Sequence, residues 1–572
     1  MNCLESRERT WSDRLNAVSV LAFASSLAMV LLLSWMWDEV NFTYQQPSLW
    51  IALTCLVILA VHQIRLDAFS WRVQLFWLAG ALTLLWSTAP GNSTVYLIWG
   101  LGFISSFLVG LRTPVLILPL NVILLAYGYW AALPLNLFEL QRYTSGSVHY
   151  VVGAQSLLVL PIALFNLLQT KRVSLVTVGW FLLSLLSLYL ALISGARAVY
   201  LPLTVALVLL VVRCIKKTGP RSILLVGLLI GSLVISIDRV IPNQPLLTAM
   251  GKKASVGAQV EAVAEHGGFS QRLRYWDQAL AVVLDQPLGA GVGSYQATAH
   301  FYQKYPMTWS NSPHNYYLET LATGGWLRLA LLLLLLVPPL VRVWFSPDWP
   351  WALAVGGFWM TLAFDVTSYY PSFMMLAFMS LGVIYSKLTT LDRQTRPMWQ
   401  RLVPRALSVA TVITGASLAA WWFFPCDGVM CSVDRYLGID YKVLPALERA
   451  SPADRLAILH RARQLYPLSS WVVRAEQRYI ESPDERLALA REFASRFPYQ
   501  HPENYLDWAN AALAIGRHEE AITAVNAGLE VFPADEYPYG ERRMTPERYA
   551  QWIEDANAIL ATASSDREDE VH

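Results

Sequence analysis

The stretch TGGWLRLALLLLLLVPPLVRV, residues 323–343, decides the fold because it is apolar over a length that can cross a bilayer. Twelve other segments in the first 424 residues share this character: 16–36, 48–63, 70–88, 94–111, 114–133, 148–169, 173–193, 198–214, 222–237, 350–367, 371–388 and 405–424. Three of them, 48–63, 198–214 and 222–237, are short. The sequence therefore predicts an all-α, polytopic membrane protein of about 12–13 transmembrane helices.

The composition of the chain agrees with a membrane protein. Only 15% of its 572 residues are charged, against about 25% in soluble domains, and the mean hydropathy is +0.39. The net charge of +2 is small for this length, which argues against nucleic-acid binding.

Basic residues set the expected orientation of the spans. With the N-terminus in the cytoplasm, the inner segments hold Arg7, Arg9, Arg14, Arg65, Arg72, Arg112, Lys171, Arg172, Arg213, Lys216, Lys217, Arg221, Arg342, Lys387, Arg393, Arg396, Arg401 and Arg405. The short outer loops hold only Arg142 and Arg197. This asymmetry predicts a cytoplasmic N-terminus. The first apolar segment lacks a small-residue cleavage site and is expected to be a retained helix.

Three regions follow from this topology. Residues 1–424 form the transmembrane domain, which includes an outer loop at 238–322. Residues 425–562 form a helical domain on the outer side, because an odd number of spans separates the two ends of the chain. Residues 563–572 are polar and are expected to be disordered.

The unit from Tyr505 to Pro533 resembles a tetratricopeptide repeat, with small residues where two helices would touch and a closing proline. Such repeats bind peptides or proteins on a concave face, so the tail is expected either to recruit a partner or to cap the outer loop. Cys426 and Cys431 precede it on the side where a disulfide is permitted; two unrelated thiols are the alternative. No Cys and His spacing typical of a metal site occurs, and we expect no cofactor.

Arginines stand out at two places on the expected outer face. Arg197 follows the turn Ser194–Gly195–Ala196, whose small residues would let a bulky ligand approach the backbone. Arg272 and Arg274 begin an amphipathic helix. Because charge near hydrocarbon is costly, we expect these guanidinium groups to hold an anionic ligand. The alternative for Arg197 is a snorkelling surface anchor.

A histidine lies between Pro313 and Asn315, directly before the span quoted above. An imidazole exposed to water here can act as a base near neutral pH, and Asn315 can cap the following helix. Glu319, one turn further on, could orient His314 or pair with an arginine. Asp365 ends the next span and could cap a helix or hold His314 or an arginine in place. A structural role at the helix start is the alternative for His314.

The turn DQPLGAGVG, residues 285–293, is only superficially similar to a phosphate-binding loop. No strand is expected before it and the lysine of a P-loop is missing. A turn that folds the loop over the membrane is the more economical interpretation.

In order, spacing and expected sidedness, these segments resemble the O-antigen ligase superfamily over roughly residues 150–390. That group contains lipopolysaccharide O-antigen ligases, O-antigen polymerases and pilin-type protein O-oligosaccharyltransferases. Its pattern is a small-residue turn with Arg, an Arg segment that runs into Trp and a Pro-x-Gly-x-Gly turn, and His-Asn before a helix. The matching residues here are 194–197, 272–276 with 287–293, and 314–325. The segment 147–156 lacks the Asn that the family carries there.

The resemblance implies a metal-independent glycosyltransferase of the bacterial inner membrane, whose donor is a glycan on undecaprenyl pyrophosphate. Arg197 and Arg272 would hold the pyrophosphate and stabilise it as a leaving group, since guanidinium groups supply the positive charge. His314 would activate an acceptor hydroxyl, and the displacement would invert the anomeric carbon. Four residues would support these three: Arg274, Asn315, Glu319 and Asp365.

Three acceptors fit this scheme: lipid A-core for a ligase, a second lipid-linked glycan for an O-antigen or exopolysaccharide polymerase, and a protein Ser or Thr for an oligosaccharyltransferase. The helical tail favours a protein acceptor, or a partner that delivers one. A polytopic transporter or flippase for an anionic or lipid-linked substrate is the alternative of another class. Transporters usually place charge near the midplane, whereas the key charges here are expected at one face.

Overall fold

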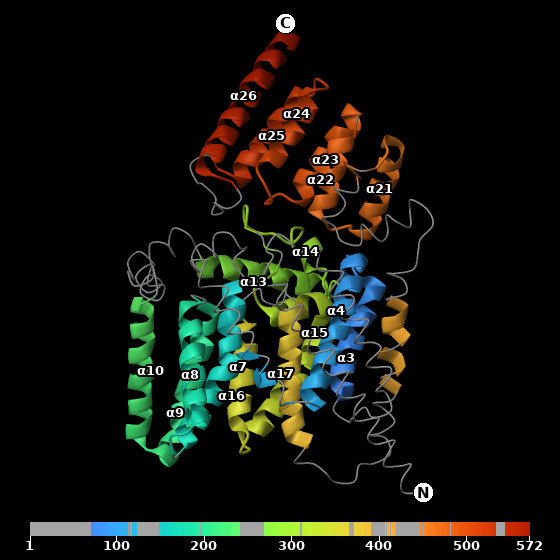
Figure 1. Ribbon diagram of the computed structural model, residues 1–572. Helices are drawn as coiled ribbons and strands as arrows, with labels where there is room; N and C mark the ends of the chain where they lie inside the picture. Colours follow the sequence, from blue (N-terminus) through green and yellow to red (C-terminus); the bar gives the residue numbers. More distant parts are fainter. Residues whose placement is uncertain are drawn as a thin grey trace.

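The computed structural model of the chain is built from α-helices (Figure 1). It describes residues 70–112, 114, 117–119, 121–122, 148–170, 172–194, 197–240, 268–308, 310, 312–364, 371–389, 406–407, 409–411, 413–418, 447–448, 450–480, 482–533 and 544–571. The expected spans 16–36 and 48–63, and the pair Cys426 and Cys431, lie outside these residues. No strand occurs in the described part of the chain, and the predicted all-α class is confirmed.

The helices that form the membrane bundle are α3 (Ser70–Leu82) with the 3-10 turn η2 (Thr83–Trp86), α4 (Pro90–Arg112), α7 (Val148–Gln169), α8 (Leu175–Ile193), α9 (Arg197–Thr218), α10 (Pro220–Val240), α15 (Tyr316–Trp344), α16 (Trp349–Thr361) and α17 (Pro371–Thr389). Five of them, α4, α7, α8, α9 and α15, are long and apolar enough to cross a membrane. The chain is therefore a polytopic membrane protein, as predicted.

The bundle has two apolar cores. One lies among α3, α4, α15, α16 and α17, and the other among α7, α8, α9 and α10, with the start of α16 between them. Glycines bring α4 and α17 together. A Cβ atom at Gly110 would lie 1.9 Å from the Met379 carbonyl oxygen, and one at Gly382 would lie 2.0 Å from that of Phe107. Small residues of this kind let membrane helices pack with their backbones in contact.

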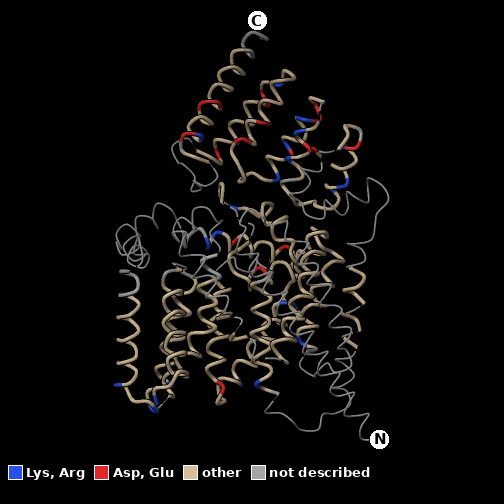
Figure 2. The backbone as a smooth tube through the Cα atoms, in the orientation of Figure 1, with Lys and Arg blue, Asp and Glu red and all other residues tan. Residues whose placement is uncertain are grey.

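Two further helices, α13 (Gly268–Asp285) and the short α14 (Tyr295–Thr298), cover one end of the bundle (Figure 1). The apolar face of α13 packs on the first half of α15 through Ala279, Val283 and Leu321. Basic side chains lie at the opposite end of the bundle, in the last turns of α9, α15 and α17 (Figure 2). A cytoplasmic N-terminus predicts this distribution of charge, and the orientation itself stays a prediction.

In the part of the tail that the structure describes, six helices stack above α13 and α14: α21 (Pro452–Leu465), α22 (Ser470–Tyr479), α23 (Pro483–Arg496), α24 (Glu503–Leu513), α25 (His518–Val531) and α26 (Pro546–Val571) (Figure 1). The hydroxyls of Ser451 and Ser482 accept hydrogen bonds from N–H groups in the first turns of α21 and α23, each just before a proline. Consecutive helices pack on each other. The unit Tyr505–Pro533 is the pair α24 and α25, although its assignment as a tetratricopeptide repeat stays a prediction.

Helix α26 continues to Val571, into the segment 563–572 for which the sequence predicts disorder. Trp552, Ala556, Ile559 and Ala563 recur at helical spacing and are all buried against the tail. Burial of this apolar stripe stabilises α26 although the sequence around it is polar.

Candidate active site

His314 lies in a strained turn directly before α15. Its backbone has a φ of 54°, in the left-handed region that non-glycine residues rarely adopt. The backbone N–H donates to the Ser312 hydroxyl at 3.1 Å, and the half-buried imidazole stacks on the Tyr275 ring, with centroids 5.6 Å apart and planes 15° from parallel. Strain of this kind persists where the surrounding contacts hold it, and here both the backbone and the ring are held.

Asn315 and Glu319 form the other side of this turn. The Asn315 side chain accepts from the N–H groups of Tyr317 and Leu318 at 3.0 and 3.1 Å, so the predicted helix cap is confirmed. The buried Glu319 carboxylate accepts from the Ser312 hydroxyl at 3.2 Å. Because that hydroxyl also accepts the His314 N–H, Glu319 supports the turn through Ser312. The sequence predicted a supporting role for Glu319 but did not identify Ser312 as the link.

The two arginines of α13 occupy different surroundings. Arg274 donates to the Thr308 hydroxyl at 3.4 Å, and its guanidinium carbon lies 5.0 Å from the Tyr305 ring centroid. Arg272 is half-buried, and it precedes Tyr275 by three residues, which places the two on one face of the helix. Arg272 therefore lies on the face of α13 whose Tyr275 stacks on His314. Arg274 instead contacts the segment that contains Tyr305 and Thr308.

The Gly-rich turn after α13 fits into a break in α15. Gly325 has φ 70° and ψ −179°, which interrupts the helix. The N–H groups of Ala290 and Gly291 donate to the carbonyls of Ala322 and Thr323, each at 2.9 Å. Carbonyls before a helix break need partners other than the next turn, and this turn supplies them. Its role in the described structure is structural, in agreement with the sequence interpretation.

The glycines of this turn are required by close packing and by backbone angle. Gly289, Gly291 and Gly293 have φ values of 90°, 105° and 71°. A Cβ atom at Gly289 would lie 2.5 Å from the Gly325 nitrogen, and one at Gly291 would lie 2.1 Å from the Ser87 hydroxyl oxygen. The turn therefore joins α13, α15 and the segment between η2 and α4 in a fixed arrangement below His314.

The remaining predicted residues are placed only in part. Arg197 begins α9, and α9 begins at the end of the bundle that α13 covers (Figure 1). The described atoms do not include the Arg197 side chain, and Asp365 lies outside the described residues. Among the described residues, no three His, Cys, Asp or Glu side chains gather into a group that could hold a metal ion.

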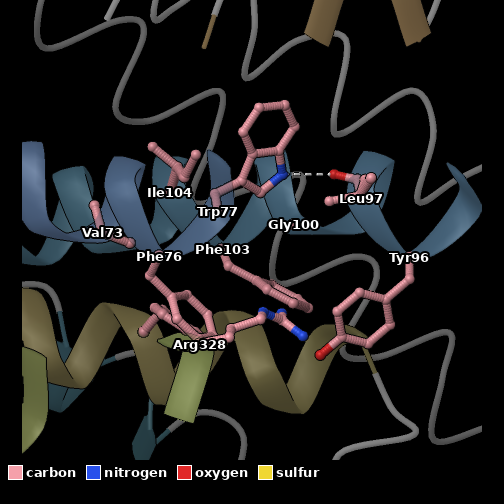
Figure 3. Close-up of a pocket in the computed structure, with 10 residues that line it drawn as sticks. Val73, Phe76, Trp77, Tyr96, Leu97, Gly100, Phe103, Ile104 and Arg328 are labelled. Atoms are coloured by element: carbon pink, nitrogen blue, oxygen red, sulfur yellow. Dashed lines mark hydrogen bonds between the residues drawn. The ribbon is translucent and has the colours of Figure 1, made fainter. Parts of the chain in front are cut away.

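Sequence reasoning missed a buried cation one turn below the break in α15. Arg328 is 3% exposed, and its guanidinium carbon lies 4.6 Å from the Phe76 ring centroid and 5.4 Å from that of Tyr96 (Figure 3). The adjoining cavity has a volume of about 10 Å³, room for one water-sized molecule. The signal was a single Arg within an apolar span, a pattern that marks function or a special packing role by default.

Space for Arg328 comes from glycine. A Cβ atom at Gly324 would lie 2.3 Å from the Arg328 Cδ, and one at Gly80 would lie 3.2 Å from its Nε. The arginine stem therefore folds back over the break in α15, and its charge rests between rings of α3 and α4. This arrangement ties the broken helix to the first core of the bundle.

Comparison with known families identifies the region that holds this site. Residues 182–335 match the family model described as O-antigen ligase. This match supports the resemblance of the region to the O-antigen ligase superfamily. No curated protein and no solved structure matches the chain.

The O-antigen ligase region begins within α8 and ends within α15. It includes both arginine segments, the Gly-rich turn, His314 and Arg328, and it leaves Asp365 and the C-terminal helices outside. The match supports a glycosyltransferase of the ligase or polymerase type, in a membrane setting and with a lipid-linked glycan as the implied donor.

Proposed function

We propose that this protein transfers a glycan from undecaprenyl pyrophosphate to an acceptor hydroxyl, on the periplasmic face of the bacterial inner membrane. The observation that carries the proposal is the joint between α13 and the turn before α15. It holds a half-buried imidazole against Tyr275, one helical turn from Arg272. A base beside a cation is what a displacement with an anionic leaving group needs.

In the proposed reaction, the acceptor oxygen attacks the anomeric carbon of the donor sugar and its proton passes to the His314 imidazole. The bond from the anomeric carbon to the pyrophosphate oxygen breaks, and undecaprenyl pyrophosphate leaves. Arg197 and Arg272 bind its oxygens and offset the charge that develops, which an arginine fork does in a bidentate manner. Attack opposite the leaving group inverts the anomeric configuration.

The lipid part of the donor has a candidate place on the same helix as Arg197. An apolar groove of about 450 Å³ lies among α9, α15 and α16. Its walls include Pro202, Val205, Leu209, Val341, Gly357 and Met360. A polyprenyl chain whose pyrophosphate is bound at the start of α9 would meet this groove below it, where burial of apolar surface is favourable.

The acceptor is proposed to be a protein Ser or Thr, with lipid A-core as the next candidate. The observation in favour is the helical domain stacked on the end of the bundle that carries His314 (Figure 1). A partner bound to that domain would be delivered next to the imidazole. A polymerase or a transporter would not need such a platform.

The test uses purified protein in proteoliposomes with an undecaprenyl-pyrophosphate-linked oligosaccharide. Three acceptors are offered separately: a secreted protein from the same cell, lipid A-core, and a second lipid-linked glycan. We expect transfer to the protein, abolished by His314→Ala. Transfer only to lipid A-core or to the second lipid-linked glycan would replace the acceptor assignment, and movement of donor across the bilayer without transfer would refute the proposal.

A further inference from the structure

The segment 297–308, named the strap here, leads from α14 toward His314 and lies between the membrane domain and the C-terminal helices. It ends six residues before His314. On its membrane side, Lys304 forms an ion pair with Asp277 of α13 at 3.1 Å. Arg274 of the same helix contacts Thr308. The strap is thus anchored to the helix that carries Arg272.

On its other side, the first residues of the strap contact the C-terminal helices. The fully buried His300 forms a hydrogen bond through Nδ1 with the Ser470 hydroxyl, which also accepts from Gln500 at 2.8 Å. The Phe301 ring meets Phe497 edge to face, with centroids 6.3 Å apart. These contacts fix the first half of the strap to α22 and to the segment after α23.

Met307 provides the second point of attachment. It is 1% exposed, and its side chain belongs to an apolar cluster whose other members all come from the C-terminal domain: Ala494, Tyr505, Phe532, Met544, Tyr549 and Trp552. Its N–H donates to the Tyr499 carbonyl at 2.7 Å, and Gln303 donates to the same carbonyl at 2.6 Å. The backbone at Met307 has a φ of 51°. A non-glycine residue held in this region needs its surroundings to fix it.

We propose that Met307 is a positioning residue for the transfer reaction, through which the C-terminal domain holds the turn that carries His314. The inference rests on the proposed function. Met307 is buried in the core of the C-terminal domain. The seventh residue after it is His314, whose imidazole must meet an acceptor oxygen in the proposed reaction. Small displacements of a catalytic group reduce turnover strongly. The C-terminal domain therefore helps to build the site, in addition to any role in choosing the acceptor.

The experiment compares the purified full chain with Met307→Ala, Met307→Leu and Leu487→Ala. Leu487 is also 1% exposed but lies in a different core of the C-terminal domain, away from the strap. We expect Met307→Ala to lower kcat for transfer at least about tenfold while the donor KM changes less than about twofold. Met307→Leu should retain most of the activity, because Leu has nearly the volume of Met. Leu487→Ala should lower the thermal unfolding temperature similarly and leave kcat unchanged.

A second measurement does not depend on catalysis. A cysteine placed at Ser310, between Met307 and His314, reports the mobility of the turn by its rate of reaction with a maleimide. We expect this rate to rise at least about fivefold when Met307→Ala is added, and to stay unchanged with Leu487→Ala. An unchanged rate, an unchanged kcat with Met307→Ala, or an equal kcat loss in the Leu487 variant overturns the positioning role. Wild-type protein without transfer, or an active His314→Ala variant, refutes the proposed function instead, while the labelling result still decides the strap.

Discussion

Tyr275 and His314 stack with their ring centroids 5.6 Å apart and their planes 15° from parallel. The contact joins α13 to the turn before α15, two elements separated in sequence by the Gly-rich turn and the strap. Because Arg272 lies one turn before Tyr275 on α13, this stack also sets how a bound pyrophosphate would lie relative to the imidazole. In the proposed reaction, the geometry of transfer would thus depend on Tyr275, a residue that carries out no chemistry.

Replacing Tyr275 tests this dependence. A ring pair contributes about 0.5–1.5 kcal/mol beyond burial, so we expect Tyr275→Leu to lower kcat by up to about tenfold at a nearly unchanged donor KM. Tyr275→Phe keeps the stack and should retain most of the activity. Steady-state kinetics of the two purified variants give the comparison, and equal rates for Leu and Phe would show that the stack is irrelevant to turnover.

The arginines of α13 should differ in their response to lysine. We expect Arg272→Lys to lower kcat/KM for the donor by about tenfold or more, because an ammonium cannot bind two oxygens in the planar fork of a guanidinium. Arg197→Lys should behave in the same way. Arg274→Lys should be milder, since Arg274 contacts Thr308 and Tyr305 of the strap. A larger loss at Arg274 than at Arg272 would exchange their assigned roles.

The Gly-rich turn should be intolerant of even one methyl group. A Cβ atom at Gly291 would lie 2.1 Å from the Ser87 hydroxyl oxygen, and the residue has a φ of 105°. The backbone strain alone costs about 1–3 kcal/mol, and the clash adds to it, so Gly291→Ala should lower the free energy of unfolding by at least that amount. Gly356 in α16 has nothing within 4 Å of the same position, and Gly356→Ala serves as the control. Thermal unfolding followed by size-exclusion chromatography measures both. Equal melting temperatures for Gly291→Ala and Gly356→Ala would mean that the Gly-rich turn is not closely packed against its neighbours.

The orientation can be measured with single cysteines in a chain whose own cysteines are replaced by Ser. Thr523 on α25 and Lys217 in the last turn of α9 are both exposed and lie at opposite ends of the molecule. A membrane-impermeant maleimide added to cells with a permeabilised outer membrane should label Thr523→Cys and spare Lys217→Cys. The reverse pattern would place the site in the cytoplasm and exclude a periplasmic acceptor.

Much of the architecture could be predicted because apolar length is a strong local signal. The expected spans at 94–111, 148–169 and 173–193 correspond to α4, α7 and α8. The Asn315 cap was also predictable, since a cap depends on neighbours three residues away. The span beginning at 323 was less accurate, because α15 starts at Tyr316 and breaks at Gly325. A search for apolar segments misses the first turns of a helix when those turns contain polar residues.

The contacts that arrange the candidate site depend on residues far apart in sequence and could not be predicted from local patterns. Tyr275 resembles an ordinary residue on the apolar face of a helix, and its stack on His314 requires the fold. Met307 lies in the segment between α14 and α15, yet its partners in the apolar cluster run from Ala494 to Trp552, far later in the sequence. The prediction of a disordered end at 563–572 used composition alone and took no account of the buried residues that run along α26 as far as Ala563.

The central claim is that His314 is the base that activates the acceptor, and a pair of substitutions tests it most directly. His314→Asn keeps a residue that tolerates the left-handed backbone, so loss of activity in it cannot be assigned to the turn. The measurement is single-turnover transfer by the purified His314→Asn and His314→Ala proteins, made with donor binding on the same samples. We expect donor binding to be retained and transfer to fall by about a hundredfold or more in both variants. Transfer at the wild-type rate by the well-folded His314→Asn protein would contradict the account.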